Sequence, residues 1–136
     1  MPIATGLYII KNVKQTNIAA LADPNDGSPL AANARSYGDD EKWNVSLLGN
    51  GKYTIRNLQQ ASFANAGNRA SAGATVEGRA QQQQWEIQET RVKGQYTIAT
   101  TDSRIYWGLA DDQPGTPIEL STSATDTRNW WSFERA

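Results

Sequence analysis

The sequence contains neither cysteine nor histidine. Without cysteine the chain forms no disulfide and offers no thiolate to a metal, and nothing indicates an oxidising compartment. Without histidine it lacks the commonest general base, the Ser-His and Cys-His nucleophile pairs and the ordinary zinc ligands. Carboxylates remain, but no recognisable scaffold motif pairs two of them for catalysis. We therefore expect a protein that is not an enzyme and that carries no cofactor and no metal.

Charge is also sparse. The 136-residue chain has a net charge of −1, and its thirteen Lys and Arg residues are scattered singly, whereas a nucleic-acid binder concentrates them in a patch. No stretch approaches the roughly 20 apolar residues of a membrane span. The first six residues show no basic leader followed by an apolar run. We expect one soluble, intracellular domain with no nucleic-acid or membrane partner, secretion by an unconventional route being left open.

Three segments of the chain begin with the same Gly-x-Tyr-x-Ile pattern. Its tyrosines, 45 and then 43 residues apart, are Tyr8, Tyr53 and Tyr96. Each segment closes on a Trp-x-apolar triplet, 35, 32 and 35 residues after the tyrosine, at Trp43, Trp85 and Trp131. Because two independent landmarks keep one period, the sequence predicts three tandem repeats, at about 6–50, 51–93 and 94–136, within a single domain of residues 1–136.

Each repeat has the pattern of β-structure. Apolar and polar residues alternate with a period of two, and the turns are rich in Asn, Asp, Gly and Pro. We expect four short strands per repeat, at about 7–13, 17–22, 28–34 and 42–48 in the first. Four-stranded units also build propellers, but a propeller needs at least four of them. Three units therefore predict an all-β fold, a β-trefoil with a six-stranded barrel and a hairpin cap.

Over about residues 5–135 the sequence resembles the ricin-B-type trefoils, in particular the cysteine-free fungal lectins and the mushroom protease inhibitors. The resemblance rests on the Gly-x-Tyr-x-Ile openings, on the turn Asp26–Leu30 with its counterpart at 115–118, and on the Gln-x-Trp element of that family. This element is intact only as Gln83-Gln84-Trp85, since Glu41 and Asn129 stand in the Gln position of the other repeats. The resemblance implies a trefoil fold.

The residues that bind sugar in that family are altered here. In sugar-binding members an Asp on the second strand accepts hydrogen bonds from sugar hydroxyls, and an Asn shortly before the Trp gives a further contact. By offset from the opening Tyr, the Asp position falls on Ala20, Asn65 and Gly108. The Asn position falls on Asp40, Gln82 and Arg128. Only the second repeat has two polar side chains there, so the resemblance does not by itself imply a galactose-type pocket.

Five aromatic residues fall outside the repeated pattern: Tyr37, Phe63, Tyr106, Trp107 and Trp130. Phe63 and Tyr106 share the offset of Ile18, so we expect both in the core. Trp107 follows Tyr106 in a strand and is expected to point the opposite way, where the other repeats have alanine. An exposed indole there is a stacking platform for a sugar ring or a partner surface. The alternative is that it packs under a neighbouring loop, and Trp130 has the same two alternatives.

Two turns are rich in oxygen atoms, namely Asp23, Asn25 and Asp26 in the first repeat and Asp111, Asp112 and Gln113 in the third. Ca²⁺ needs six to eight oxygens in a fixed array, and no EF-hand-like spacing is present. We interpret both as turns in which the side chains bond nearby backbone. Single loop arginines at Arg35, Arg69 and Arg104 are candidates for the projecting residue of an inhibitory loop.

We interpret the chain as a lectin-like carbohydrate-binding module. The candidate glycan site is in the third repeat, at Tyr106, Trp107, Asp111, Asp112 and Gln113, or in the second, at Asn65 and Gln82. We expect weak binding, and mannose over galactose because the galactose-type Asp is missing. Two alternatives stay open, both acting on a protein partner through loops. One is a protease inhibitor, as related mushroom trefoils are, and the other a companion subunit similar to the lectin-like trefoil that accompanies mushroom tyrosinase.

Overall fold

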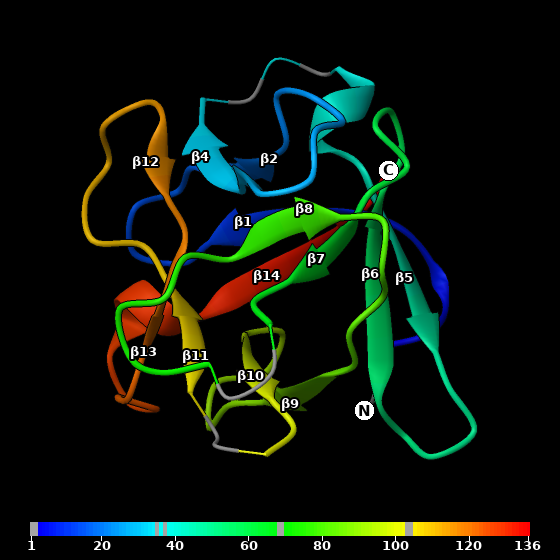
Figure 1. Cartoon of the computed structure of the whole chain (residues 1–136). Helices are drawn as coiled ribbons and strands as arrows, with labels where there is room; N and C mark the ends of the chain where they lie inside the picture. The colour runs from blue at the N-terminus through cyan, green and yellow to red at the C-terminus, as the bar shows by residue number, and fades with distance from the viewer. Residues whose placement is uncertain (1–2, 35, 37, 68–69, 103–104) are drawn as a thin grey trace.

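The computed structural model describes residues 3–34, 36, 38–67, 70–102 and 105–136. Six strands pair antiparallel in a closed ring, in the order β1-β5-β6-β9-β10-β14 and back to β1. They span Gly6–Asn12 (β1), Trp43–Leu47 (β5), Tyr53–Asn57 (β6), Trp85–Glu89 (β9), Tyr96–Thr100 (β10) and Trp131–Arg135 (β14). Each repeat contributes its first and last strand to this barrel (Figure 1). The predicted trefoil is confirmed.

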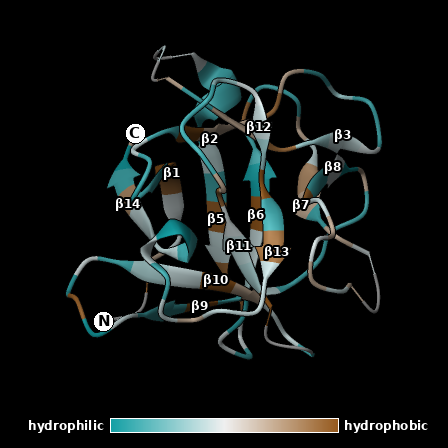
Figure 2. Cartoon of the chain, turned by 90° about the vertical axis from the view of Figure 1, so that its left-hand side faces the viewer, coloured by the Kyte–Doolittle hydropathy of each residue, from teal (hydrophilic) through white to brown (hydrophobic). Residues whose placement is uncertain are grey.

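Shorter strands form the cap over one end of the barrel. They are β2 (Ile18–Ala20), β3 (Ser28–Pro29), β4 (Ala31–Asn33), β7 (Phe63–Asn65), β8 (Glu77–Arg79), β11 (Tyr106–Gly108), β12 (Thr116–Pro117) and β13 (Glu119–Ser121). Two single-turn 3-10 helices, η1 (Asp39–Glu41) and η2 (Thr127–Asn129), precede closing tryptophans. The described part of the chain contains no helix long and apolar enough to cross a membrane. Hydrophobic residues lie mainly on the strands and hydrophilic ones on the connecting loops (Figure 2).

A ring of three backbone hydrogen bonds joins the repeats at the centre of the cap. Leu30 N–H donates to the carbonyl of Val76 (2.8 Å), Val76 N–H to that of Ile118 (2.9 Å), and Ile118 N–H to that of Leu30 (2.8 Å). All three side chains are fully buried. The predicted strand at 28–34 is split into β3 and β4 because Leu30 turns its N–H to this ring.

The closing tryptophan of each repeat bonds the second strand of the same repeat. The indole Nε1–H of Trp43 donates to the carbonyl of Ala19 at 2.9 Å. The equivalent bonds run from Trp85 to Ala64 at 3.0 Å and from Trp131 to Trp107 at 3.0 Å. All three indoles are fully buried, and a buried indole N–H needs such a partner. These bonds hold the cap strands on the barrel.

The sequence analysis assigned the aromatic residues of the second strands to the wrong faces. Phe63 and Tyr106 are only partly buried and lie outside the core, whereas Trp107 is fully buried within it. The pairing register explains this, because Phe63 lies opposite Arg56 and Tyr106 opposite Ala99. Arg56 and Ala99 each lie an odd number of residues from an inward-facing tyrosine on the same strand, so their side chains face outward. Residues directly opposite each other on paired strands share a face, so Phe63 and Tyr106 face outward as well.

Trp107 therefore fills the core at the position that holds alanine in the other two repeats. Its ring lies edge-to-face with Trp85 at a centroid distance of 5.5 Å and with Trp131 at 6.1 Å. Such T-shaped pairs stabilise a core beyond simple burial. The Nε1–H of Trp107 is buried, and none of the described residues accepts a hydrogen bond from it. An unpaired buried donor costs stability, so this indole stabilises the core through its packing and loses part of that gain through its unpaired N–H.

Replacing Trp107 or Trp131 by Phe tests this difference. Both changes remove the same atoms from the core, but Trp131→Phe also breaks the bond to the carbonyl of Trp107. Trp107→Phe instead removes a donor that has no partner among the described residues. We expect Trp131→Phe to lower the free energy of unfolding by about 1–3 kcal/mol more than Trp107→Phe does. Urea denaturation of the two variants measures it, and equal losses would contradict this account.

Candidate functional site

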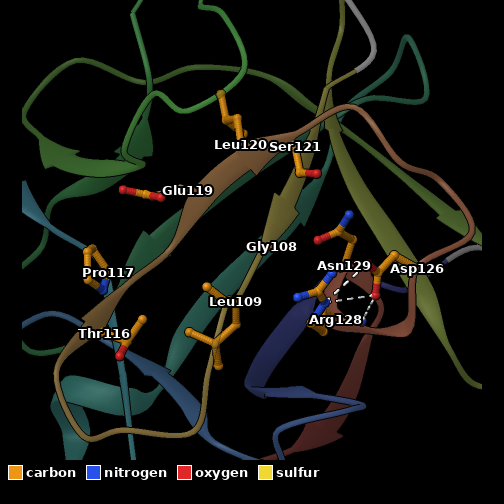
Figure 3. Close-up of a pocket in the computed structure, with 11 residues that line it drawn as sticks. Gly108, Leu109, Thr116, Pro117, Glu119, Leu120, Ser121, Asp126, Arg128 and Asn129 are labelled. Atoms are coloured by element: carbon orange, nitrogen blue, oxygen red, sulfur yellow. Dashed lines mark hydrogen bonds and ion pairs between the residues drawn. The ribbon is translucent and has the colours of Figure 1, made fainter.

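A pocket of about 250 Å³ lies in the third repeat between β11, β13 and η2 (Figure 3). Gly108 and Leu109 line it from the end of β11, Glu119 and Ser121 from β13, and Arg128 from η2. Gly108 and Arg128 are the residues at the two sugar positions that the resemblance defined. The sequence analysis missed the β13 residues, because they come from a strand that carries no part of that motif.

Two charged groups of this third-repeat pocket, Asp126 and Arg128, are bound to each other, while the third, Glu119, is exposed. Arg128 Nη2 lies 2.7 Å from Asp126 Oδ2, and the Arg128 N–H donates to Asp126 Oδ1 at 2.9 Å. These bonds lower the pKa of Asp126 and raise that of Arg128. The pair therefore holds η2 in place and lines the pocket with compensated charge (Figure 3).

Gly108 cannot be replaced by the missing Asp without a rearrangement. A Cβ at this position would lie 2.2 Å from Oδ1 of Asn129, well inside van der Waals contact. Asn129 is itself held by a 2.8 Å bond from its Nδ2 to the carbonyl of Ser123. The pocket thus keeps the position of the family's sugar site but not its carboxylate acceptor.

A second, more polar pocket of about 350 Å³ lies in the second repeat. Asn65 and Gln82 both line it, so the structure brings these two predicted residues together, beside Arg79 and Asp102. The Asn65 amide already bonds backbone on both sides: Nδ2 donates to the carbonyl of Gln81 (2.9 Å) and Oδ1 accepts from Gly67 N–H (2.7 Å). Gln82 is exposed and is the more available of the two side chains.

The five residues predicted as a third-repeat site do not form one. Trp107 is in the core, Tyr106 lies on the outer face of β11, and neither lines the third-repeat pocket. Asp111, Asp112 and Gln113 are exposed in the loop between β11 and β12. Trp130 is buried with its Nε1–H bonded to the carbonyl of Ala124 (2.8 Å), so it packs under the neighbouring loop.

The oxygen-rich turns are braced by their first aspartate. Asp23 Oδ1 accepts from the N–H of Asn25 at 3.0 Å and from the hydroxyl of Ser28. Asp111 Oδ1 accepts from the N–H of Gln113 at 2.9 Å and from the hydroxyl of Thr116 at 2.6 Å. The interpretation as turn chemistry is confirmed. Within the described residues no group of three or more acidic side chains is placed to hold a metal ion.

The remaining loop candidates cannot be placed. Arg35, Arg69, Arg104 and Tyr37 lie outside the described residues.

The Gln position of the Gln-x-Trp element has a clear structural role. Gln83 Oε1 accepts from Ala66 N–H (2.6 Å), and Glu41 accepts from the N–H of Ser36 (3.1 Å). In the first two repeats this residue therefore holds a backbone N–H, within the loop before Trp43 at Glu41 and across the repeat at Gln83.

Together the closed barrel and the triangular cap of the three repeats define a β-trefoil. A family model described as peptidase inhibitor I66 matches residues 1–135. The chain belongs to the peptidase inhibitor I66 family. A search of curated proteins gave no match.

Solved structures share the fold at low sequence identity. The Macrolepiota procera ricin B-like lectin, solved in complex with lactose, has a TM-score of 0.89 at 17% identity, with 100% of this chain and 99% of that chain covered. The Rhizoctonia solani agglutinin has a TM-score of 0.92 at 19% identity, with the same coverage. The designed three-fold symmetric protein ThreeFoil has a TM-score of 0.90 at 18% identity, covering 96% of this chain and 99% of that chain. These likenesses establish the fold.

The carboxyl groups of Asp23 and Asp111 are expected to titrate below their ordinary pKa of 3.8, because each accepts a hydroxyl and a backbone hydrogen bond. A lowered pKa means that the bracing is present above pH 3.8 and is lost as the pH falls through the folded-state value. Carboxyl NMR titration measures both groups. Ser28→Ala is expected to raise the pKa of Asp23 and leave that of Asp111 unchanged; an unmoved Asp23 would contradict the assignment.

Proposed function

We propose that the protein is a peptidase inhibitor that inserts the loop of residues 22–27, between β2 and β3, into the cleft of a peptidase. The observation that carries this proposal is the match of an inhibitor family over residues 1–135. The function favoured from the sequence, a lectin-like module, thereby becomes the second candidate. An inhibitor needs no catalytic residue of its own, which agrees with the absence of histidine and cysteine.

The 22–27 loop is exposed and held in one shape. Pro24, Asn25 and Asp26 are exposed at its tip. Besides the bonds to Asp23, the carboxylate of Asp26 accepts from Ala80 N–H at 2.9 Å, and Gly27 N–H donates to the carbonyl of Gly78 at 3.0 Å. A loop that is ordered before binding loses less conformational entropy in the complex. This supports it as the inserted segment.

The third-repeat loop of residues 110–115 provides a matched control. It has the same bracing aspartate and the same left-handed glycine, with φ of +93° at Gly27 and +87° at Gly115. Its tip differs, since Gln113 stands where the first loop has Asn25. Because the two loops belong to different repeats, a cleft that accepts one of them leaves the other outside.

Inhibition assays test the proposal with a serine peptidase of the trypsin type and a cysteine peptidase of the papain type. We expect the wild type to inhibit one of them and Asn25→Ala to raise the inhibition constant at least about tenfold, the effect of losing roughly 1.4 kcal/mol of contact. Gln113→Ala is expected to leave it unchanged. Equal effects of both variants would contradict the choice of loop, and no inhibition of either peptidase class by the wild type would contradict the function.

Glycan binding is a second candidate function, favoured by the hollows that persist at the sugar positions of two repeats. We propose Gln82 as a hydroxyl-binding residue in the second repeat, and mannose over galactose because no carboxylate stands at the Asp position. Titration with mannose and lactose, followed by NMR shifts of the second-repeat amides, tests it. Gln82→Ala is expected to remove the response to mannose. A role as companion subunit of an enzyme such as tyrosinase and an intracellular location stay predictions.

A further inference from the structure

A groove outside the repeat pockets crosses the outer face of β9, β10 and β11. It holds about 260 Å³ between this face, the turn of residues 90–94 and the segment that contains Ala124 and Thr125. A smaller hollow of about 30 Å³ continues it toward Glu86 and Ala99. Gln88, Thr97 and Tyr106 line both hollows, so the two are parts of one groove with Tyr106 at their junction.

The groove lies where the side chains of the third repeat differ from those of the second. In the second repeat the guanidinium of Arg56 lies 5.3 Å from the ring centroid of Phe63, and its Nε–H donates to the carbonyl of Ala61 (3.0 Å). The corresponding pair in the third repeat is Ala99 and Tyr106, which face each other across β10 and β11. The short side chain of Ala99 leaves the space beside the tyrosine ring that Arg56 fills in the second repeat.

The far end of the groove is formed by Trp130, where the other repeats have Lys42 and Gln84. The indole is fixed by its bond to Ala124, and the guanidinium of Arg91 lies 5.4 Å from its ring centroid. This wall is therefore rigid and already ordered. A preformed wall lowers the entropic cost of holding a small ligand.

Each charged side chain around the groove already makes a contact within the protein. Glu86 forms an ion pair with Lys52, Glu89 accepts from Gly94 N–H at 2.8 Å, and Arg91 lies over Trp130. The other polar groups are the amide of Gln88 and the hydroxyls of Thr90, Thr97, Thr125 and Tyr106. A neutral ligand with many hydroxyls matches this lining, whereas a charged one displaces pairs already made.

We propose that this groove binds a neutral saccharide unit, with the apolar face of the pyranose against Tyr106 and its hydroxyls bonded to Gln88 and Thr97. Aromatic side chains present such an apolar face beside a polar handle. The site is separate from the repeat pockets, whose lining shares none of these three residues. It is also separate from the inhibitory loop: β2 and β3 lie in the upper part of Figure 2, and β9 and β10 in the lower part.

Amide NMR spectra of the full chain with four soluble sugars test the proposal. The neutral probes are methyl α-mannoside, lactose and chitotriose, and the acidic one is sialyllactose. We expect at least one neutral probe to shift the amides of Gln88, Thr97 and Tyr106 together with the indole signal of Trp130, with a dissociation constant on the order of 1 mM, as is usual for a small exposed site. Tyr106→Ala is expected to weaken this binding at least tenfold.

Phe63→Ala is the matched control, because it removes the ring at the same position of the second repeat and is expected to leave the shifts unchanged. Asn25→Ala is expected to leave them unchanged as well, so failure of the inhibitory loop and failure of the groove are told apart. The proposal is wrong if no neutral probe shifts these amides at about fifty times the expected dissociation constant. It is also wrong if only sialyllactose does, if the shifts map only to the repeat pockets, or if Tyr106→Ala binds as the wild type does.

Discussion

The bond from each closing tryptophan to the second strand of its own repeat is the interaction on which the fold depends. It joins a barrel strand to a cap strand three times, at Trp43, Trp85 and Trp131. The ring of backbone bonds through Leu30, Val76 and Ile118 then joins the three caps. Buried polar groups are stable only when paired, so each of these bonds satisfies a group that the core would otherwise leave unpaired. Everything outside this frame is free to differ between repeats.

The altered sugar positions show how such differences are coupled. In the third repeat Asn129 replaces the Gln of the Gln-x-Trp element, and its Oδ1 occupies the space that a side chain at position 108 would need. The residues at 108 and 129 are therefore coupled, because the present position of the Asn129 amide leaves room only for glycine at 108. In the second repeat the Gln83 amide is retained, and a polar residue, Asn65, stays at the corresponding position. The loss of the carboxylate acceptor is thus a change of packing as well as of chemistry.

The sequence predicted the repeats, the barrel and the braced turns, because periodic landmarks and turn residues report local structure directly. It did not predict which face of the second strand is inward. That depends on the pairing of Tyr106 with Ala99 and of Phe63 with Arg56, which is a register between strands. Assigning the inward positions from the offset shared with Ile18 placed Trp107 outside. The groove beside Tyr106 also depends on this register, so no reading of single positions reveals it.

Trp107 and Tyr106 show that an aromatic residue outside the repeated pattern serves either the core or the outer surface of a trefoil. The former replaces an alanine of the core and packs on Trp85 and Trp131, so it serves the fold. The latter occupies the outward position beside a small residue and leaves its ring beside a hollow. Loops and outer strand faces vary without disturbing the shared frame. One chain of this size therefore has room for both the proposed inhibitory loop and the proposed saccharide groove, because neither depends on the residues of the other.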